Sequence, residues 1–419
     1  MARPNVQFRI NDESLVVPIT EQFSATIGAV YNATESLKIL GTSAEQSAGF
    51  FYVQNNADWY SRLTNLIYAL AGGITFYQGQ TAYTVGSCAA TFLDATYVGD
   101  GANGILLNQG AAGISSGHFG DEWYPIYNFL QYGGSCYVGF GEGAVGISQG
   151  FYDLDYQVMF EGGSGGGNYL SALTSVVDYK KGTETPCIGV VTQPSVTTTI
   201  SSAPSAPSGT SSYDYIRVYG EKLHLDMLGN DTVETNLAAD IAGCLVRTDR
   251  DAYPWFSPAG TRRGRILNVV RLARTLTATE QDILYDAGFN PVVTFPGDGT
   301  LLYGDKTGET ATSTLSRINV SRLFMYIKRA LAPVARSILF EQNDSITRSR
   351  FKVAAEGFLD RIVGQRGISE YRVICDTTNN TPEIIEANYF VADILIKPVT
   401  SINYVTITLT NKDLSDSLG

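Results

Sequence analysis

Residues 316–340 constrain the fold more than any other stretch of the chain, because they divide into two distinct faces of a helix. At about 100° per residue, the apolar residues of this run fall on one face. They are Val320, Leu323, Phe324, Ile327, Leu331, Val334 and Ile338. The run therefore predicts a long amphipathic helix, which Pro333 should bend.

The opposite face of this helix is basic. Its cations fall within an arc of about 140°, and they are Arg317, Arg322, Lys328, Arg329 and Arg336. A helix face that only keeps a protein soluble usually mixes both signs of charge. The face is either solvated or in electrostatic contact with an acidic partner, and its single sign slightly favours a partner.

A second helix and two strands follow. Ser345 or Thr347 is expected to cap the helix, and Gly364 to end it. The ranges 384–396 and 402–410 read as two long strands.

Both ends of the chain carry strand patterns, in which apolar and polar residues alternate. The apolar members are Val6, Phe8 and Ile10 at one end and Val405, Ile407 and Leu409 at the other. No partner hairpin follows the N-terminal run at close range. That run is either an edge strand of its own sheet or an arm that adds to the sheet of a neighbouring chain.

Composition divides the rest of the chain. Residues 41–117 are rich in Gly, Ala, Ser, Thr and Tyr, and Arg62 is their only basic residue. Short β-like runs at 74–77 and 82–85 lie between turn signals, which predicts an inserted β-rich domain. Residues 194–212, rich in Pro, Ser and Thr, predict a loop excursion.

Several shorter elements can be placed. The ranges 121–132, 168–179 and 236–248 have helical spacing, while 187–191 and 215–225 have strand character. Thr277 and Glu280 have the spacing of a capping box at the start of another helix, which Gly288 ends.

Charge is also uneven. Residues 1–212 contain 6 basic and 16 acidic residues, whereas residues 213–419 contain 23 basic and 25 acidic residues. This asymmetry indicates at least two parts that face different surroundings. The net charge of −12 argues against a non-specific nucleic-acid binder.

The five cysteines are scattered and form no CxxC pair. They indicate neither a disulfide framework nor a zinc site, and they fit a reducing compartment during assembly. The N-terminus lacks the apolar segment of a secretory signal. The sequence contains no run of about 18 apolar residues, so we expect no transmembrane helix.

The sequence gives little sign of an enzyme. His118 and His224 are the only histidines, and His224 alternates with leucines in a strand, so we expect it on the surface. The run 299–307 resembles a phosphate-binding loop, but Asp305 would place a carboxylate where phosphate oxygens must lie. We therefore predict a turn and a strand there, and no catalytic residue, cofactor or metal.

Three runs together resemble a known family. They are Tyr-Pro-Trp-Phe-Ser-Pro-Ala-Gly at 253–260, Thr-Phe-Pro-Gly-Asp-Gly-Thr-Leu-Leu-Tyr-Gly-Asp-Lys-Thr at 294–307, and Glu-Tyr-Arg-Val-Ile-Cys-Asp-Thr-Thr-Asn-Asn-Thr-Pro at 370–382. Their order and spacing look like those of the contractile tail sheath proteins of tailed bacteriophages, especially the T4 type. The segments 390–394, 401–404 and 128–133 look like the same family, and the specific part covers roughly residues 250–410.

The resemblance implies an α+β fold, with a mixed α/β core domain built from both chain ends and an inserted β-rich outer domain. The corresponding divisions are an arm at 1–20, a core at 21–40 and 118–400, an outer domain at 41–117 and a strand arm at 401–419. The arms would join sheets in neighbouring subunits, and we expect the basic helix face to meet the tail tube.

The implied function is structural. Sheath subunits form stacked hexameric rings around the tube, with the baseplate and tail terminator as further partners, and they contract to drive the tube into the host envelope. The expected location is the virion tail, after assembly in the host cytoplasm.

Three alternatives stay open. The chain could be the sheath of a phage-derived contractile injection system or bacteriocin. It could be a carbohydrate-binding virion protein, given the aromatic residues of 41–117. It could also be a nucleotide-using enzyme built on 299–307, against which Asp305 argues.

Overall fold

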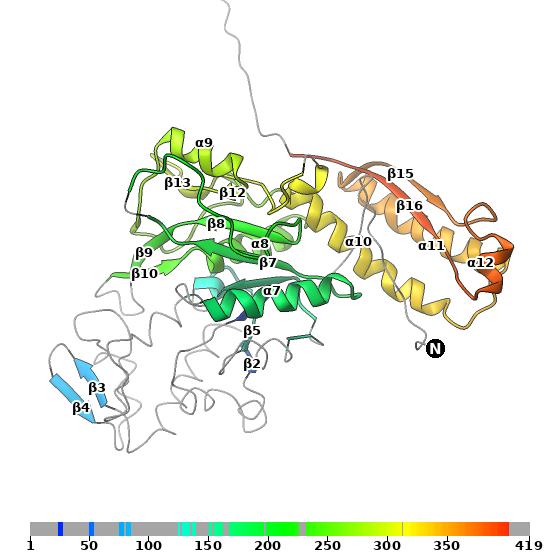
Figure 1. Cartoon of the computed structure of the whole chain (residues 1–419), viewed down its shortest axis with the longest axis horizontal. Helices are drawn as coiled ribbons and strands as arrows, with labels where there is room; N and C mark the ends of the chain where they lie inside the picture. The colour runs from blue at the N-terminus through cyan, green and yellow to red at the C-terminus, as the bar shows by residue number, and fades with distance from the viewer. Residues whose placement is uncertain are drawn as a thin grey trace, which may run out of the picture.

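Figure 1 shows the computed structural model of the chain. The structure describes residues 24–27, 50–53, 75–78, 81–84, 125, 128–134, 136–139, 151–152, 155–161, 167–196, 198–225, 232–311 and 313–401. The arm residues Val6, Phe8, Ile10, Val405, Ile407 and Leu409 lie outside these ranges, as does His118.

The largest sheet among the described residues has seven strands in the order β12-β8-β7-β6-β1-β5-β2. The strands are β1 (Ser24–Ile27), β2 (Phe50–Val53), β5 (Cys136–Gly139), β6 (Val158–Glu161), β7 (Ile188–Gln193), β8 (Tyr215–Tyr219) and β12 (Phe289–Asn290). Every neighbouring pair is parallel except β2 with β5. Parallel sheets need cover on both faces, and two helices supply it here.

The helices α7 (Gly167–Lys181) and α8 (Ala238–Asp251) lie on opposite faces of this main sheet (Figure 1). Leu173 and Val176 of α7 pack with Met159 of β6 and Val191 of β7. Successive strand residues point to opposite faces, so the residues between these lie toward α8, which also contacts β6 and β7. Both helices confirm those expected at 168–179 and 236–248, with ends that differ by one to three residues.

The main sheet extends into the range expected to form the insert. Strand β2 lies between residues 41 and 117, yet it pairs with β5 in the register Phe51 opposite Val138. Residues 50–53 therefore belong to the main sheet, because a local apolar run is hidden in the average composition of 41–117. The expected strands near 74–77 and 82–85 are confirmed as a separate hairpin of β3 (Thr75–Gln78) and β4 (Thr81–Thr84).

Residues 215–225 form two strands instead of one. Gly220 separates them with φ +93°, a conformation that residues with a side chain rarely adopt. After it the chain leaves the main sheet and enters a smaller antiparallel sheet in the order β10-β9-β11. Its strands are β9 (Glu221–Leu225), β10 (Thr232–Asn236) and β11 (Arg271–Leu272).

Helix α9 (Ala278–Asp286) has the predicted capping box, in which the Thr277 side chain accepts from the Glu280 amide and the Glu280 carboxylate accepts from the Thr277 amide. An antiparallel hairpin of β13 (Val292–Phe295) and β14 (Gly299–Leu302) follows. Residues 299–302 are thus a paired strand, and the expectation of a strand and turn in place of a phosphate loop is confirmed.

The rest of the chain forms a second body, which we call the C-terminal body. Its elements are η2 (Thr314–Ser316), α10 (Ile318–Ser337), α11 (Ser345–Gly364), β15 (Ile368–Ile374), α12 (Pro382–Glu386) and β16 (Asp393–Pro398). Strands β15 and β16 pair antiparallel. The predicted apolar face of α10 is confirmed, since Val320, Leu323, Phe324, Ile327 and Leu331 are buried in one cluster with α11 and β15.

Two expectations for this body are wrong. The range 384–396 does not form one strand, because Pro382 stands at the first turn of the short helix α12, where a proline is pre-organised for a helical start. The cap of α11 is Asp344, whose Oδ1 accepts from the amides of Ile346 at 3.0 Å and Thr347 at 2.8 Å. An aspartate accepts these bonds as well as a serine or threonine does.

None of the helices among the described residues is both long and apolar enough to span a membrane.

Candidate functional site

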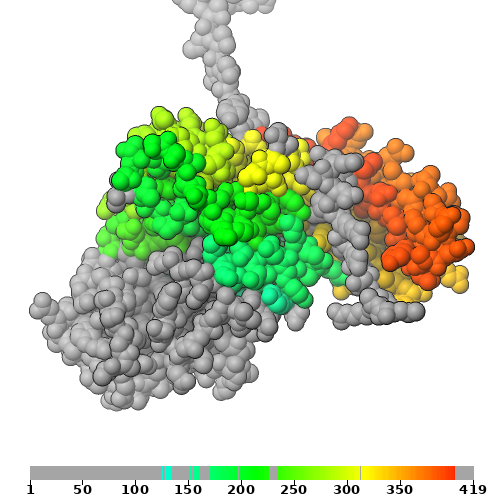
Figure 2. Space-filling model, viewed as in Figure 1, coloured from blue at the N-terminus to red at the C-terminus, as the bar shows by residue number. Residues whose placement is uncertain are grey.

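Helix α10 packs on two sides. Its apolar face belongs to the core of the C-terminal body, and its opposite face lies against the ends of α7 and α8 and the loops that precede β6 and β7. We call this second contact the α10 seam. Figure 2 shows the two parts that it joins, with the main-sheet part in green and the C-terminal body in orange.

The first contact of the seam is a buried ion pair. An Nη2 atom of Arg322 lies 2.5 Å from Oδ2 of Asp249, which stands near the end of α8, and both side chains are almost fully buried. Burial raises the pKa of Asp249, and the guanidinium of Arg322 opposes this shift. The pair therefore keeps two charges inside the protein by holding them against each other.

Two more cations of α10 donate to backbone carbonyls. Nη2 of Arg329 donates to the carbonyl of Pro186 at 3.0 Å and to that of Tyr156, and Nη1 lies 3.0 Å from Oδ1 of Asp155. Nζ of Lys328 donates to the carbonyl of Lys181, the last residue of α7, at 2.8 Å. Burial lowers the pKa of Lys328 to about 8.

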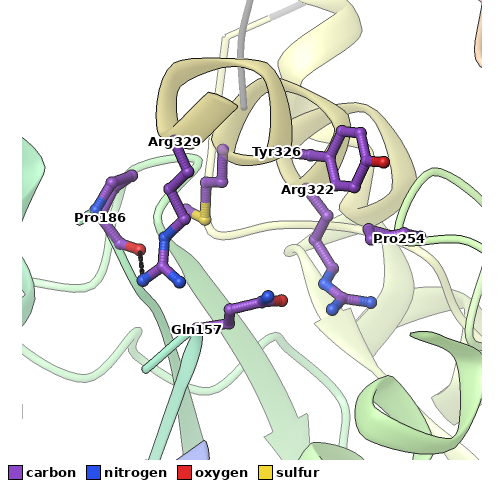
Figure 3. Close-up of a pocket in the computed structure, with 7 residues that line it drawn as sticks. Gln157, Pro186, Pro254, Arg322, Tyr326 and Arg329 are labelled. Atoms are coloured by element: carbon purple, nitrogen blue, oxygen red, sulfur yellow. Dashed lines mark hydrogen bonds between the residues drawn. The ribbon is translucent and has the colours of Figure 1, made fainter. Parts of the chain in front are cut away.

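A small pocket lies within the seam. It is lined by Gln157, Pro186, Pro254, Arg322, Met325, Tyr326 and Arg329. Figure 3 shows the side chains of Arg322 and Arg329 extending from α10 on either side of Gln157. Burial raises the pKa of Tyr326 to about 12, so its phenol keeps its proton at neutral pH.

The structure divides the five basic residues that the sequence placed on one face. Arg322, Lys328 and Arg329 are buried and bind groups within the chain, which accounts for their common sign without an external partner. Arg317 donates to the hydroxyl of Tyr285 at 2.8 Å. Arg336 pairs with Glu184 at 3.2 Å and has the most exposed side chain of the five, at 58%.

A contact between this face and a tail tube stays a prediction. For the three buried cations it would require the seam to open, because their hydrogen-bonding atoms already face α7, α8 and the nearby loops. Arg336 needs no such rearrangement, so it is the residue of the set that a partner can reach most directly.

A second polar cluster surrounds the start of the predicted C-terminal arm. Oγ of Ser401 donates to Oδ2 of Asp305 at 2.5 Å, and Nδ2 of Asn319 donates to the carbonyl of Val399 at 3.2 Å. Asp305 and Asn319 are both buried. Burial raises the pKa of Asp305, against the opposing effects of Ser401, Ser257 and Arg317.

His224 is buried, which corrects the expectation of a surface residue. Its ring nitrogens lie 3.3 Å from the side-chain amides of Asn128 and Asn268. Strand β9 turns its polar residues inward and leaves Leu225 largely exposed, so the leucine alternation predicted the wrong face. Burial lowers the pKa of His224 to about 4.

The neighbouring polar residue on β9 was also missed. Lys222 is fully buried, and its Nζ lies 2.8 Å from Oδ1 of Asp240 in α8. The hydroxyl of Tyr132 donates to the same oxygen at 3.0 Å. A lysine and a histidine at alternate positions of a strand are the sequence signal that could have identified this face.

The described residues contain no group of three or more His, Cys, Asp or Glu side chains placed to hold a metal ion. Four of the described groups whose pKa values are shifted lie in contacts that hold the fold together. They are Asp249 in the seam, Asp305 beside Ser401, and His224 and Asp240 between β9 and its neighbours.

Comparison with known proteins connects the C-terminal body to a family. Residues 310–411 match the family described as phage tail sheath C-terminal domain. Over 187 residues, or 44% of this chain, the sequence is 46% identical to the tail sheath proteins of Vibrio phage KVP40 and of Enterobacteria phage T4. The chain is related to the tail sheath proteins of T4-type phages. The matched segment spans 28% of the length of each of these two relatives.

Solved structures match a larger part of the chain. One chain of the anti-feeding prophage baseplate, 6-fold symmetrised, aligns with 98% of this chain and 99% of its own length, with a TM-score of 0.66 and 14% identity. The sheath complex of the extracellular contractile injection system PVC in the contracted state aligns with 98% of both chains, with a TM-score of 0.67 and 15% identity. At this identity the likeness shows the fold, and it confirms the mixed α/β class.

Proposed function

We propose that this chain is a structural, non-enzymatic subunit of a contractile tail sheath, which polymerises as stacked hexameric rings around a tail tube and contracts to drive the tube through the host envelope. The 46% identity to two proteins named as tail sheath proteins carries the proposal. The fold adds support, since it is shared along nearly the whole chain with a sheath complex solved in the contracted state.

Strands exchanged between neighbouring subunits would hold the assembly together. We propose that the N-terminal arm, with Val6, Phe8 and Ile10, and the C-terminal arm, with Val405, Ile407 and Leu409, add strands to sheets of adjacent copies. Each backbone hydrogen bond of such a strand contributes about 0.5–1.5 kcal/mol net. Several bonds in one strand would keep subunits connected while weaker polar contacts exchange during contraction.

Other partners follow from the same proposal. The tube would lie inside the rings, the baseplate at one end and the tail terminator at the other, and the particle would assemble in the host cytoplasm. Among the described cations of α10, Arg336 is the best placed to contact the tube, because its side chain is the most exposed.

One observation favours a second type of particle. The solved sheath chains of injection systems match this chain over 98–100% of their own length, whereas the matched segment covers only 28% of the T4-type relatives. The fold of this chain therefore aligns with injection-system sheath chains along nearly their whole length. Genes for a capsid and a terminase beside this gene would identify a phage tail, and their absence from a complete locus would favour an injection system.

Electron microscopy of negatively stained, purified protein tests the proposal. The full chain is compared with a chain that ends at Ser401, with and without added tail tube protein. Hollow striated tubes from the full chain support a sheath, and their loss in the shorter chain supports the strand-donating arm. Dispersed particles from the full chain, even with tube protein, would contradict the proposal and favour the carbohydrate-binding alternative.

A further inference from the structure

Two of the runs and one of the shorter segments that carry the sequence resemblance meet at one place in the fold. Trp255 belongs to the run 253–260, Asp305 to the run 294–307, and Ser401 begins the run 401–404. Asn319, in the first turn of α10, connects the run 253–260 to the residues just before 401, because its Nδ2 donates to the carbonyls of Trp255 at 3.3 Å and Val399 at 3.2 Å. Asp305 connects the run 294–307 to the run 401–404, since its side chain accepts from Ser401 at 2.5 Å.

The backbone at this place is fixed as well. The amide of Ile318 donates to the carbonyl of Asp305 at 3.2 Å, and the amide of Val399 donates to the carbonyl of Gly367 at 3.1 Å. Gly367 is closely packed, because a Cβ atom there would lie 2.5 Å from Cγ2 of Ile362. Hydrogen bonds with Asp305, Asn319 and Gly367 therefore hold residues 399–401 beside the buried start of α10.

We propose that Asp305, Asn319 and Ser401 form a clamp that fixes the position and direction from which residues after 401 leave the fold, so that they meet a neighbouring subunit in one register. This inference rests on the proposed function, and it adds to that function the residues that orient the C-terminal arm. Asp305, Asn319 and Ser401 act as positioning residues, because none of them needs to touch the neighbouring subunit.

The physics of strand addition explains why such a clamp matters. A shift of one residue in register turns every side chain of a strand to the opposite face, which would expose Val405, Ile407 and Leu409. A segment that moves freely at its root also loses more conformational entropy when it is ordered on a partner. If residues 399–401 are held in place, the loss of conformational entropy is smaller and the arm can reach fewer strand registers.

A purely structural role makes a different prediction. If the hydroxyl of Ser401 only satisfies the buried Asp305, its removal should lower the stability of the subunit without affecting local order at Val399 or assembly. If the clamp orients the arm, removal of the hydroxyl should loosen residues 399–401 and impair assembly in a subunit that stays folded.

The test uses the full chain with Ser401→Ala and Ser401→Thr. Ser369→Ala is a matched control, because Ser369 also donates through its hydroxyl, to the carbonyl of Lys397 at 3.0 Å, but at an exposed position of the same body. Hydrogen exchange at the Val399 amide measures local order, thermal melting measures folding, and electron microscopy measures tube yield.

We expect Ser401→Ala to raise the exchange rate at Val399 and to lower the tube yield, each at least tenfold, with nearly unchanged melting. Ser401→Thr should restore both values, and Ser369→Ala should leave both at the wild-type level. Wild-type exchange at Val399 in Ser401→Ala would overturn the clamp, as would normal tube yield. A wild-type chain that forms no tubes would contradict the proposed function instead, and the exchange measurement would still decide whether the clamp exists.

Discussion

Lys222 and Asp240 form an ion pair 2.8 Å long in which neither side chain is exposed to solvent. It joins β9 to α8, and Tyr132 adds a hydrogen bond to the same carboxylate oxygen. The hydroxyl of Tyr132 in turn accepts from the amide of Leu267 at 2.8 Å. The contact between the small sheet and the main-sheet part is therefore organised around one buried charge pair.

Removal of one partner of this pair should be costly. We expect Lys222→Met to lower the free energy of unfolding by about 3–5 kcal/mol, because it leaves the carboxylate of Asp240 buried without its cation. The double variant Lys222→Met/Asp240→Leu should recover part of the loss. Urea denaturation measures both, and Lys397→Met is the control, since its pair with Glu370 is largely exposed and should contribute less than about 1 kcal/mol. Equal losses in the two single variants would contradict the prediction.

The stability of the fold should depend on His224 at mildly acidic pH. Burial and Lys222 hold the pKa of His224 at about 4 in the folded protein, below the value of about 6.5 in an unfolded chain. The unfolded state therefore binds the proton more readily, so the contribution of His224 is fully present above pH 6.5 and is lost as the pH falls toward 4. The loss is on the order of 3 kcal/mol.

The comparison of wild type with His224→Gln isolates this contribution from that of nearby carboxyl groups such as Asp240. Glutamine is neutral throughout, so the variant should lose less stability than the wild type between pH 7 and pH 4.5. Urea midpoints at a series of pH values measure the difference. Parallel pH profiles would show that His224 does not titrate in this way.

The α10 seam predicts unequal roles for two arginines of one helix. Arg322→Ala should lower the free energy of unfolding by about 3–5 kcal/mol, because it leaves Asp249 buried and unpaired. Arg336→Ala should change it by less than about 1 kcal/mol, because both members of its pair are partly solvated. Chemical denaturation measures both values, and a similar effect of the two substitutions would show that the seam does not carry the charge pair described here.

Asp305→Asn should make the subunit more stable at neutral pH. Burial raises the pKa of Asp305, so its ionised form is unfavourable in the fold above that pKa, and this penalty disappears as the pH falls. An asparagine carbonyl can still accept the hydrogen bond from Ser401. Melting temperatures should be higher in the variant at pH 7 and should approach those of the wild type at pH 4, whereas a lower melting temperature at pH 7 would contradict the argument.

The spacing of residues along the sequence correctly predicted helices whose apolar residues lie on a single face. The apolar face of α10, the capping box at Thr277 and Glu280, and the range of α7 follow from spacing that a single helix imposes. The sequence resemblance predicted the similarity to tail sheath proteins, and one of its three runs, 370–382, lies within the residues that match the sheath C-terminal domain.

The errors share a physical cause. The basic face of α10 has the pattern of a solvated or partner-binding surface, but its partners within the chain lie 32 to 174 residues away in sequence. His224 and Lys222 are buried for the same reason, since their partners come from α8 and from segments far along the chain. Periodicity shows which residues share a face, and only the assembled fold shows what covers it.

The two packing faces of α10 have a mechanical consequence. A pull on the chain beyond Ser401 would pass through Asp305 and Asn319 into the first turn of α10. From there the load would divide between the apolar core shared with α11 and the charged contacts with α7 and α8. Helix α10 thus passes part of a load applied at the C-terminal end of the fold to the main-sheet part. Such a load would therefore not act on the C-terminal body alone.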